Sequence, residues 1–87
     1  MTTVPSSPLL KAFGEPININ GQPVMGIVSV TTVVEDELRS LAITIDLPAA
    51  PRRYEQGDSV LVRGMTKAIT LIEDGIDIGW LRYHVAR

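Results

Sequence analysis

The sequence predicts an all-β domain: a small antiparallel β-barrel or sandwich of about six strands with a short N-terminal helix. Two observations carry this prediction. Apolar and polar residues alternate with a period of two in several short segments, and glycine, proline, asparagine and aspartate separate those segments at hairpin spacings. A helical pattern is confined to residues 7–13. We therefore expect one meander-like β unit and exclude doubly wound and helical folds.

The N-terminal segment, residues 1–8, has two prolines, four hydroxylated residues and no periodicity. It predicts a flexible arm ahead of a single β domain over residues 9–87. Ser7 followed by Pro8 is typical of a helix N-cap with proline at the first helical position, and Gly14 would end the helix. We expect one or two helical turns; a turn with two buried leucines is the alternative, because so short a helix is marginal alone.

The first hairpin is predicted by alternating isoleucine and asparagine that ends in Asn20 and Gly21. Both of these residues tolerate the positive φ that a type I′ turn requires. The return strand covers residues 24–33, with Gly26 as a bulge or bend. Pro23 at its start favours an edge position, because proline cannot donate to a ladder.

The following segment, residues 34–40, contains three consecutive acids and predicts either a long hairpin loop or the projecting tip of two long strands. Residues 41–47 give the cleanest alternation in the chain, so one face of this strand is core. The apolar positions of that strand are Leu41, Ile43, Ile45 and Leu47.

The C-terminal half reads as a proline-stiffened loop and three further strands. The loop covers 48–57, the strands 59–63, 67–72 and 78–86, and the turns between them 64–66 and 73–75. In the last strand, one predicted face holds Leu81, Tyr83 and Val85, and the other holds Trp80, Arg82 and His84.

Composition excludes several classes of protein. The 87 residues carry 10 acids and 8 bases, a net charge of −2, which argues against a dedicated duplex-binding protein. Cysteine is absent, so there is no disulfide framework or thiolate site. The longest apolar stretch, residues 24–30, is too short to cross a bilayer, and we expect no membrane association. The chain is nevertheless 45% hydrophobic, which for so small a domain suggests surface that a neighbour covers.

Catalytic chemistry is missing from the sequence. His84 is the single histidine, and we interpret it as a half-exposed side chain on a sheet face. Glu73, Asp74 and Asp77 lack the spacing of a dedicated calcium loop and predict a solvated turn. There is no glycine-rich phosphate loop, and four aromatic residues in an acidic chain do not make a single-strand-binding groove. We expect no enzyme activity, no cofactor and no metal.

A succession of weak motifs resembles the head–tail joining proteins of long-tailed bacteriophages, the lambda-type tail-attachment or head-completion family found also in prophages. The resemblance covers residues 9–85, and its specificity lies in the order and spacing of the motifs. These are Phe13-Gly14-Glu15-Pro16, Val24-Met25-Gly26-Ile27, Asp46-Leu47-Pro48, Gly57-Asp58-x-Val60, Arg63-Gly64, Asp74-Gly75 and Gly79-Trp80-Leu81-Arg82.

The resemblance implies a non-enzymatic virion component with a barrel-like fold. Copies would form a ring, commonly a hexamer, at the head–tail junction, below the portal and its adaptor and above the tail tube or tail terminator. Assembly would take place in the host cytoplasm, and packaged DNA would pass through the lumen without specific binding. Some prophage proteins of this class carry transporter-like labels, although no motif in this sequence supports transport or ATP binding.

A ring needs two different contact patches on each copy. Arg52, Arg53 and Tyr54 form a locally basic and aromatic stretch of the kind enriched at protein interfaces; an ordinary solvated loop is the alternative. The acidic Glu35–Glu37 stretch is a candidate lining of the lumen, where it would keep DNA from binding. The full set of predicted interface residues is Val4, Leu9, Leu10, Glu35, Asp36, Glu37, Arg39, Arg52, Arg53 and Tyr54.

Two other functions stay open from the sequence. A tail-terminator or adaptor ring of the same particle would have the same general features. A small host β-barrel module that binds a peptide or an oligonucleotide is the alternative from another class, and the low isoelectric point, near 5.2, and the scarce aromatic residues argue against it.

Overall fold

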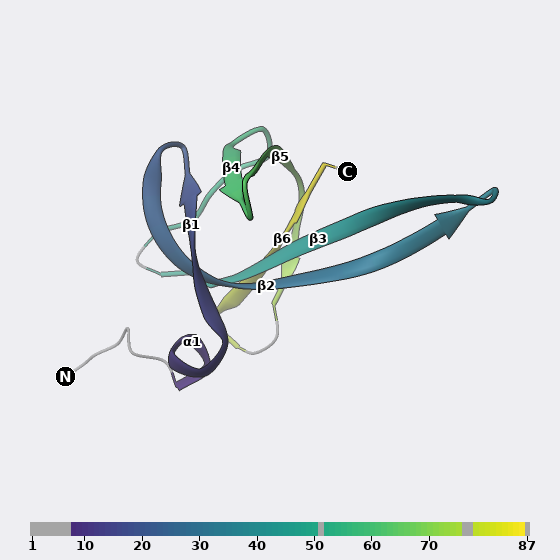
Figure 1. Cartoon of the computed structure of the whole chain (residues 1–87). Helices are drawn as coiled ribbons and strands as arrows, with labels where there is room; N and C mark the ends of the chain where they lie inside the picture. The colour runs from purple at the N-terminus through teal and green to yellow at the C-terminus, as the bar shows by residue number, and fades with distance from the viewer. Residues whose placement is uncertain (1–7, 51, 76–77, 87) are drawn as a thin grey trace.

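A computed structural model describes residues 8–50, 52–75 and 78–86. The described residues form one short helix and six antiparallel strands that close into a barrel, which confirms the predicted fold class (Figure 1). The elements are α1 (Pro8–Phe13), β1 (Gly14–Ile19), β2 (Gln22–Glu35), β3 (Leu38–Pro48), β4 (Ser59–Val62), β5 (Met65–Asp74) and β6 (Trp80–Val85). Pro8 begins the helix, and residues 1–7, including the predicted cap Ser7, lie outside the described residues. No helix in the described part of the chain could span a bilayer.

The strand order is β1-β2-β3-β6-β5-β4, with β4 closing back onto β1. The expectation of a meander is therefore wrong at one connection. β3 pairs with β6, and the segment after β3 carries the chain across to β4. The β3–β6 register aligns inward-facing apolar residues, with Ile45 opposite Tyr83 and Leu47 opposite Leu81, so burial of both strands selects this pairing.

The seam between β1 and β4 is short, because only Asn18 with Leu61 and Ile19 with Val60 form a register. Asn20 extends the seam by two hydrogen bonds to Ser59. Its backbone N–H donates to the Ser59 carbonyl at 2.8 Å, and its side-chain oxygen accepts from the Ser59 N–H at 3.0 Å.

Three hairpins close through two-residue turns with positive φ at both positions. The pairs are Asn20 with Gly21, Asp36 with Glu37, and Arg63 with Gly64. The first was predicted. The second reduces the expected 34–40 segment to a two-residue tip between long strands, so the projecting-tip alternative is the correct one. The third replaces the turn expected at residues 64–66 and starts one residue earlier, because Gly64 takes its second position.

The barrel core is the set of inward-facing residues from β1, β3, β4, β5 and β6. It consists of Ile17, Ile19, Ile43, Ile45, Leu47, Val60, Val62, Ile69, Leu81, Tyr83 and Val85. The predicted core faces of the third and last strands are confirmed, except that Leu41 is 49% exposed. Strand bounds also differ, since β5 continues to Asp74 through the expected turn.

Gly26 is buried, and the register of β2 runs through it without a bulge. A Cβ at this position would lie 2.9 Å from Cγ2 of Ile45 and 3.0 Å from Cδ2 of Leu47. The glycine therefore allows close packing against the core rather than a bulge. The irregularity of the barrel lies instead in β5, between Ile69 and Leu71.

Candidate assembly surface

The most prominent feature of the molecule is a two-stranded ribbon that projects from the barrel (Figure 1). Pairing of β2 with β1 stops at Ile27, and pairing of β3 with β6 stops at Thr44, whereas β2 and β3 stay paired to Glu35 and Leu38. We call residues 28–35 and 38–43 the ribbon. It gives the chain a longest dimension of 51 Å, against 23 and 21 Å in the other directions.

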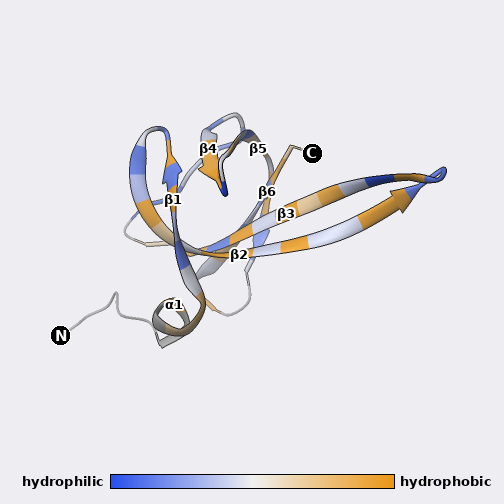
Figure 2. Cartoon of the chain, in the orientation of Figure 1, coloured by the Kyte–Doolittle hydropathy of each residue, from blue (hydrophilic) through white to orange (hydrophobic). Residues whose placement is uncertain are grey.

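The inner face of the ribbon continues the core-facing side of β3. Opposed residues of an antiparallel pair lie on the same face, so Val30, Leu41 and Val34 share the face of the buried Ile43. These three side chains are 39%, 49% and 61% exposed. Figure 2 shows the hydrophobic colouring continuing along the ribbon toward its tip. The apolar alternation that builds the barrel thus extends into solvent, and contiguous exposed apolar surface is a common feature of interaction sites.

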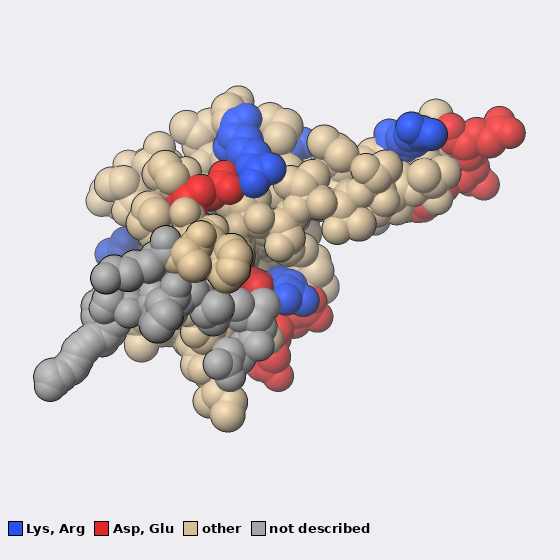
Figure 3. Space-filling view, turned by 60° about the horizontal axis from the view of Figure 1, so that its bottom comes forward, with Lys and Arg blue, Asp and Glu red and all other residues tan. Residues whose placement is uncertain are grey.

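The tip of the ribbon carries four of the predicted interface residues. Asp36 and Glu37 form the turn, Glu35 lies opposite Leu38, and Arg39 follows on the inner face. Figure 3 shows the acidic atoms gathered at this end, with a basic side chain behind them. Leu38, which the sequence placed inside a polar loop, is 74% exposed.

The basic loop after β3 divides into an exposed and an anchored part. Arg52 and Arg53 are exposed, as both an interface loop and an ordinary solvated loop predict. Tyr54 is half-buried: its ring meets the ring of Tyr83 edge to face at 5.8 Å, and its backbone N–H donates to the Tyr83 hydroxyl at 3.2 Å. The tyrosine therefore fixes the loop to the core and leaves the two arginines to solvent.

The predicted interface residues do not form one patch. The loop that begins after β3 lies on the side of the barrel opposite the ribbon tip (Figure 1). Leu10 is half-buried in α1, the side chain of Leu9 is not among those described, and Val4 lies outside the described residues. The chain therefore presents acidic and basic predicted contacts at opposite ends, which suits a subunit that meets two neighbours.

A surface ion pair joins Arg63 to Glu15, with Nε and one terminal nitrogen 3.0 and 2.7 Å from the two carboxylate oxygens. The hydrogen bond from Arg63, aided by its charge, lowers the pKa of Glu15, and the same hydrogen bond raises the pKa of Arg63. The pair links β1 to the turn after β4. It is a surface ion pair, with both side chains partly exposed.

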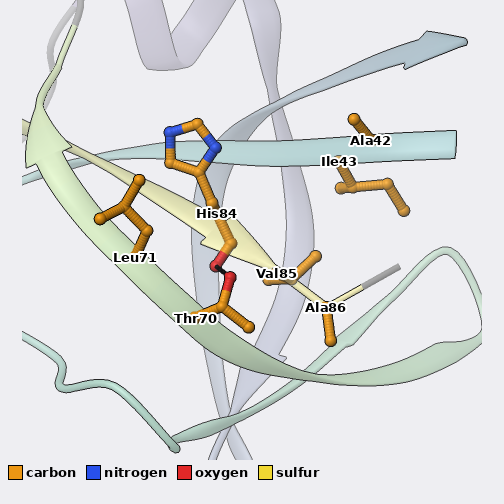
Figure 4. Close-up of a pocket in the computed structure, with 7 residues that line it drawn as sticks. All are labelled: Ala42, Ile43, Thr70, Leu71, His84, Val85 and Ala86. Atoms are coloured by element: carbon orange, nitrogen blue, oxygen red, sulfur yellow. Dashed lines mark hydrogen bonds between the residues drawn. The ribbon is translucent and has the colours of Figure 1, made fainter. Parts of the chain in front are cut away.

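His84 lies on the outer face of β6, half-buried as predicted, and its Nε2 is 2.5 Å from a carboxylate oxygen of Glu73. It borders a pocket of about 330 Å³ between the base of the ribbon and strands β5 and β6 (Figure 4). Most other lining side chains are apolar, and they come from Ala42, Ile43, Thr70, Leu71, Val85 and Ala86. One histidine–carboxylate pair beside an apolar pocket supplies neither a nucleophile nor an oxyanion site.

Metal ligands are equally sparse in the described residues. No three histidine, cysteine or acidic side chains there lie close enough to hold an ion. The predicted solvated turn after β5 is only partly described, because Asp77 lies outside the described residues.

Comparison with known proteins gives a fold and no family. The crystal structure of the ATP-binding sugar transporter-like protein from Salmonella typhimurium resembles this chain with a TM-score of 0.62, over 91% of this chain and 78% of that one, at 22% identity. At that identity the likeness shows the fold alone. No protein-family model and no curated protein matches the chain.

Proposed function

We propose that this chain is a structural protein of the phage head–tail junction, where copies form a ring that completes the filled head and attaches the tail. The observation that carries the proposal is the projecting ribbon. The barrel closes on itself and buries its own core, yet the apolar face of β3 continues outward through Val30, Val34 and Leu41. A self-contained domain gains nothing from such a face, whereas a ring subunit uses it on its neighbours.

Several glycines of the motifs that resemble the head–tail joining family lie at turns and close-packed positions of this barrel. Gly14 follows α1 directly, Gly26 allows close packing of β2 on the core, and Gly64 closes the β4–β5 turn. Gly57 donates its backbone N–H to the Ile69 carbonyl at 2.8 Å. The motif residues therefore fill turn and close-packing positions of this barrel.

The name of the Salmonella protein refers to ATP binding and sugar transport. Neither activity has a counterpart in this sequence, which contains no P-loop lysine motif and no G-x-G-x-x-G. Some prophage proteins of the class that this chain resembles carry such labels, so the name does not oppose a virion role.

The position within the neck is proposed as that of a stopper or tail-attachment ring, commonly sixfold in the family that the chain resembles. A tail terminator or adaptor ring is the nearest alternative. Imaging separates them, because a terminator adds density to the end of isolated tails and a head-completion ring adds density to the portal vertex.

The deciding experiment adds the purified protein to DNA-filled, tailless heads of the phage that encodes it. We expect a ring of added density at the portal vertex in cryo-electron micrographs, retained DNA and a gain in tail joining. A host peptide- or oligonucleotide-binding module predicts none of these. Unchanged vertices at saturating protein, together with salt-sensitive binding to single strands, would establish that module instead.

The acidic tip has a proposed role in the same ring. If Asp36 and Glu37 face the lumen, their charge keeps the DNA from binding the channel wall. Charge reversal of Glu35, Asp36 and Glu37 should then slow DNA ejection. Ejection rates and infectivity equal to those of the wild type would remove this role without touching the ring itself.

A further inference from the structure

One edge of the ribbon is left open where β6 ends. β6 runs beside β3 as far as the pair of Thr44 and His84, and then turns toward β5, where the Ala86 N–H donates to the Ala68 carbonyl at 2.8 Å. On the edge of β3 away from β2, no described strand lies beside residues 38–43. Residues 38–43 contain no proline or glycine and one charge, Arg39, so this edge lacks the usual features that prevent strand addition.

The pocket lies where this edge meets the barrel. Figure 4 shows Ala42 and Ile43 on β3 across from Thr70 and Leu71 on β5, with Val85 and Ala86 between them. Its volume, about 330 Å³, is ample for one aliphatic side chain. A strand that adds to the edge of β3 would run in line with β6 and would place one side chain at the mouth of this pocket.

The chain itself offers the matching side chain. Leu38 lies at the far end of the same edge and is 74% exposed. Leu38 and Ala42 are four residues apart in one strand, so they share the outer face of the sheet. If two identical edges pair antiparallel, Leu38 of one copy can lie next to Ala42 of the other copy.

We infer that two copies of this chain pair through the edge of β3, antiparallel over residues 38–42 about a dyad at Ser40, with Leu38 of the partner subunit in the pocket beside Ala42. The ribbons then form one four-stranded sheet, β2-β3-β3-β2, with the barrels at its opposite ends. This contact is isologous and differs from the heterologous contacts of a ring, so it goes beyond the proposed function and does not rest on it.

The register follows from the two faces of the strand. A shift by one residue would set outer side chains opposite inner ones, which the pleat forbids. A shift that places Leu38 opposite Thr44 would collide with His84, which already occupies that position. A shift the other way leaves only residues 38–40 paired. The pairing of Leu38 with Ala42 is therefore the longest that the edge accepts.

The dyad also brings two like charges, one from each copy, close together in the contact. On the inner face, Arg39 lies opposite Leu41 of the partner subunit, and the two Arg39 side chains lie diagonally across the axis. Like charges on an exposed sheet face repel, and salt screens them. The dimer should therefore tighten as salt is added, and Arg39→Gln should tighten it further at low salt.

Cross-linking tests the register directly, because the chain contains no cysteine. We expect the Ser40→Cys variant, without a second variant present, to form a disulfide dimer under mild oxidation. Residue 40 of one copy lies opposite residue 40 of the other copy across the dyad. Leu38→Cys and Ala42→Cys should each stay largely uncross-linked alone and should cross-link when mixed. No linkage in the mixture, or equal self-linkage of Leu38→Cys, would overturn the pairing.

Sedimentation equilibrium of the whole chain tests the contact without a covalent bond. Leu38→Lys should weaken dimerisation by about 100- to 10,000-fold, because the twofold contact loses two buried aliphatic side chains, and Leu38→Ser should weaken it as well. The matched control for Leu38→Ser is Val34→Ser, which also changes an exposed apolar side chain, but on the inner face, and should leave the dimer unchanged. A wild-type monomer at all concentrations, or loss of the dimer in Val34→Ser with retention in Leu38→Ser, would overturn the inference.

Discussion

Asp46 and Arg82 lie directly opposite each other in the β3–β6 ladder and are joined by two hydrogen bonds. Arg82 donates from Nε to Oδ1 at 3.0 Å and from a terminal nitrogen to Oδ2 at 3.3 Å. The Asp46 side chain is only 3% exposed. The hydrogen bond to Asp46, followed by its charge, raises the pKa of Arg82. It ties the two strands together just before the ribbon leaves the barrel.

Asp46→Asn should lower the free energy of unfolding by about 1–2 kcal/mol, because a neutral amide replaces a buried charged acceptor and leaves Arg82 poorly satisfied. Urea denaturation measures this. The matched control is Glu55→Gln, which neutralises an exposed acid in the loop before β4. Equal stability losses in the two variants would mean that solvent screens the Asp46–Arg82 pair despite its burial.

The turn at the ribbon tip holds two non-glycine residues at positive φ, Asp36 at 48° and Glu37 at 67°. Replacing them by Asn and Gly should stabilise the ribbon by about 1 kcal/mol, because this pair fits a type I′ turn without strain. Amide hydrogen exchange of residues 33–40 should slow accordingly. A variant with Asn and Gln at the two positions removes the same charges and keeps the strain; if it slows exchange equally, the gain is electrostatic.

The ion pair of Glu15 and Arg63 makes the free energy of unfolding depend on pH in the acidic range. Because the folded pKa of Glu15 is lowered, its contribution is complete above the pKa of an unfolded glutamate, about 4.3, and is lost as pH falls through the folded value. Glu15→Gln should therefore reduce stability near neutral pH and match the wild type at low pH. Urea midpoints over this range test it, and the difference should shrink in high salt. A constant difference at all pH values would assign the effect to packing.

Arg52→Glu with Arg53→Glu should leave the fold intact and abolish joining of filled heads to tails. Both side chains are exposed, and Tyr54 holds the loop through its contacts with Tyr83. Circular dichroism tests whether the fold is intact, and in vitro complementation of heads with tails measures joining. Lys67→Glu, a single charge reversal on β5, is the control. Normal plaque formation by the double variant would refute a role for these arginines.

The sequence predicted what depends on neighbouring residues. Ile43, Ile45 and Leu47 alternate with polar residues, and the pleat alone sends them to one face. Asn20 and Gly21 specify their turn by backbone geometry. The β3–β6 pairing could not be predicted in the same way, because it joins segments about 36 residues apart and rests on the matching of two buried faces.

The candidate surface was predicted only in its charges. Glu35, Asp36 and Arg39 are recognisable as a solvated cluster, and the structure places them at one tip. The apolar alternation continues to Val34, and this part of it lies in solvent because β1 and β6 end earlier. The points at which those strands end are set by tertiary structure and could not be predicted from local sequence. The role of Leu38 depends on the pocket and was missed for the same reason.

The short seam at Asn20 has a consequence for how the chain folds. The three tight hairpins bring together residues that are close in sequence, whereas joining β1 to β4 encloses about 40 residues and rests on two residue pairs and the two hydrogen bonds to Ser59. Loop closure costs about the same here as in the β3–β6 pairing, but this seam offsets the cost with far fewer paired residues, so we expect the barrel to close here last. We therefore expect Asn20 to act twice in folding, first in the turn between β1 and β2 and later in the hydrogen bonds that close the β1–β4 seam.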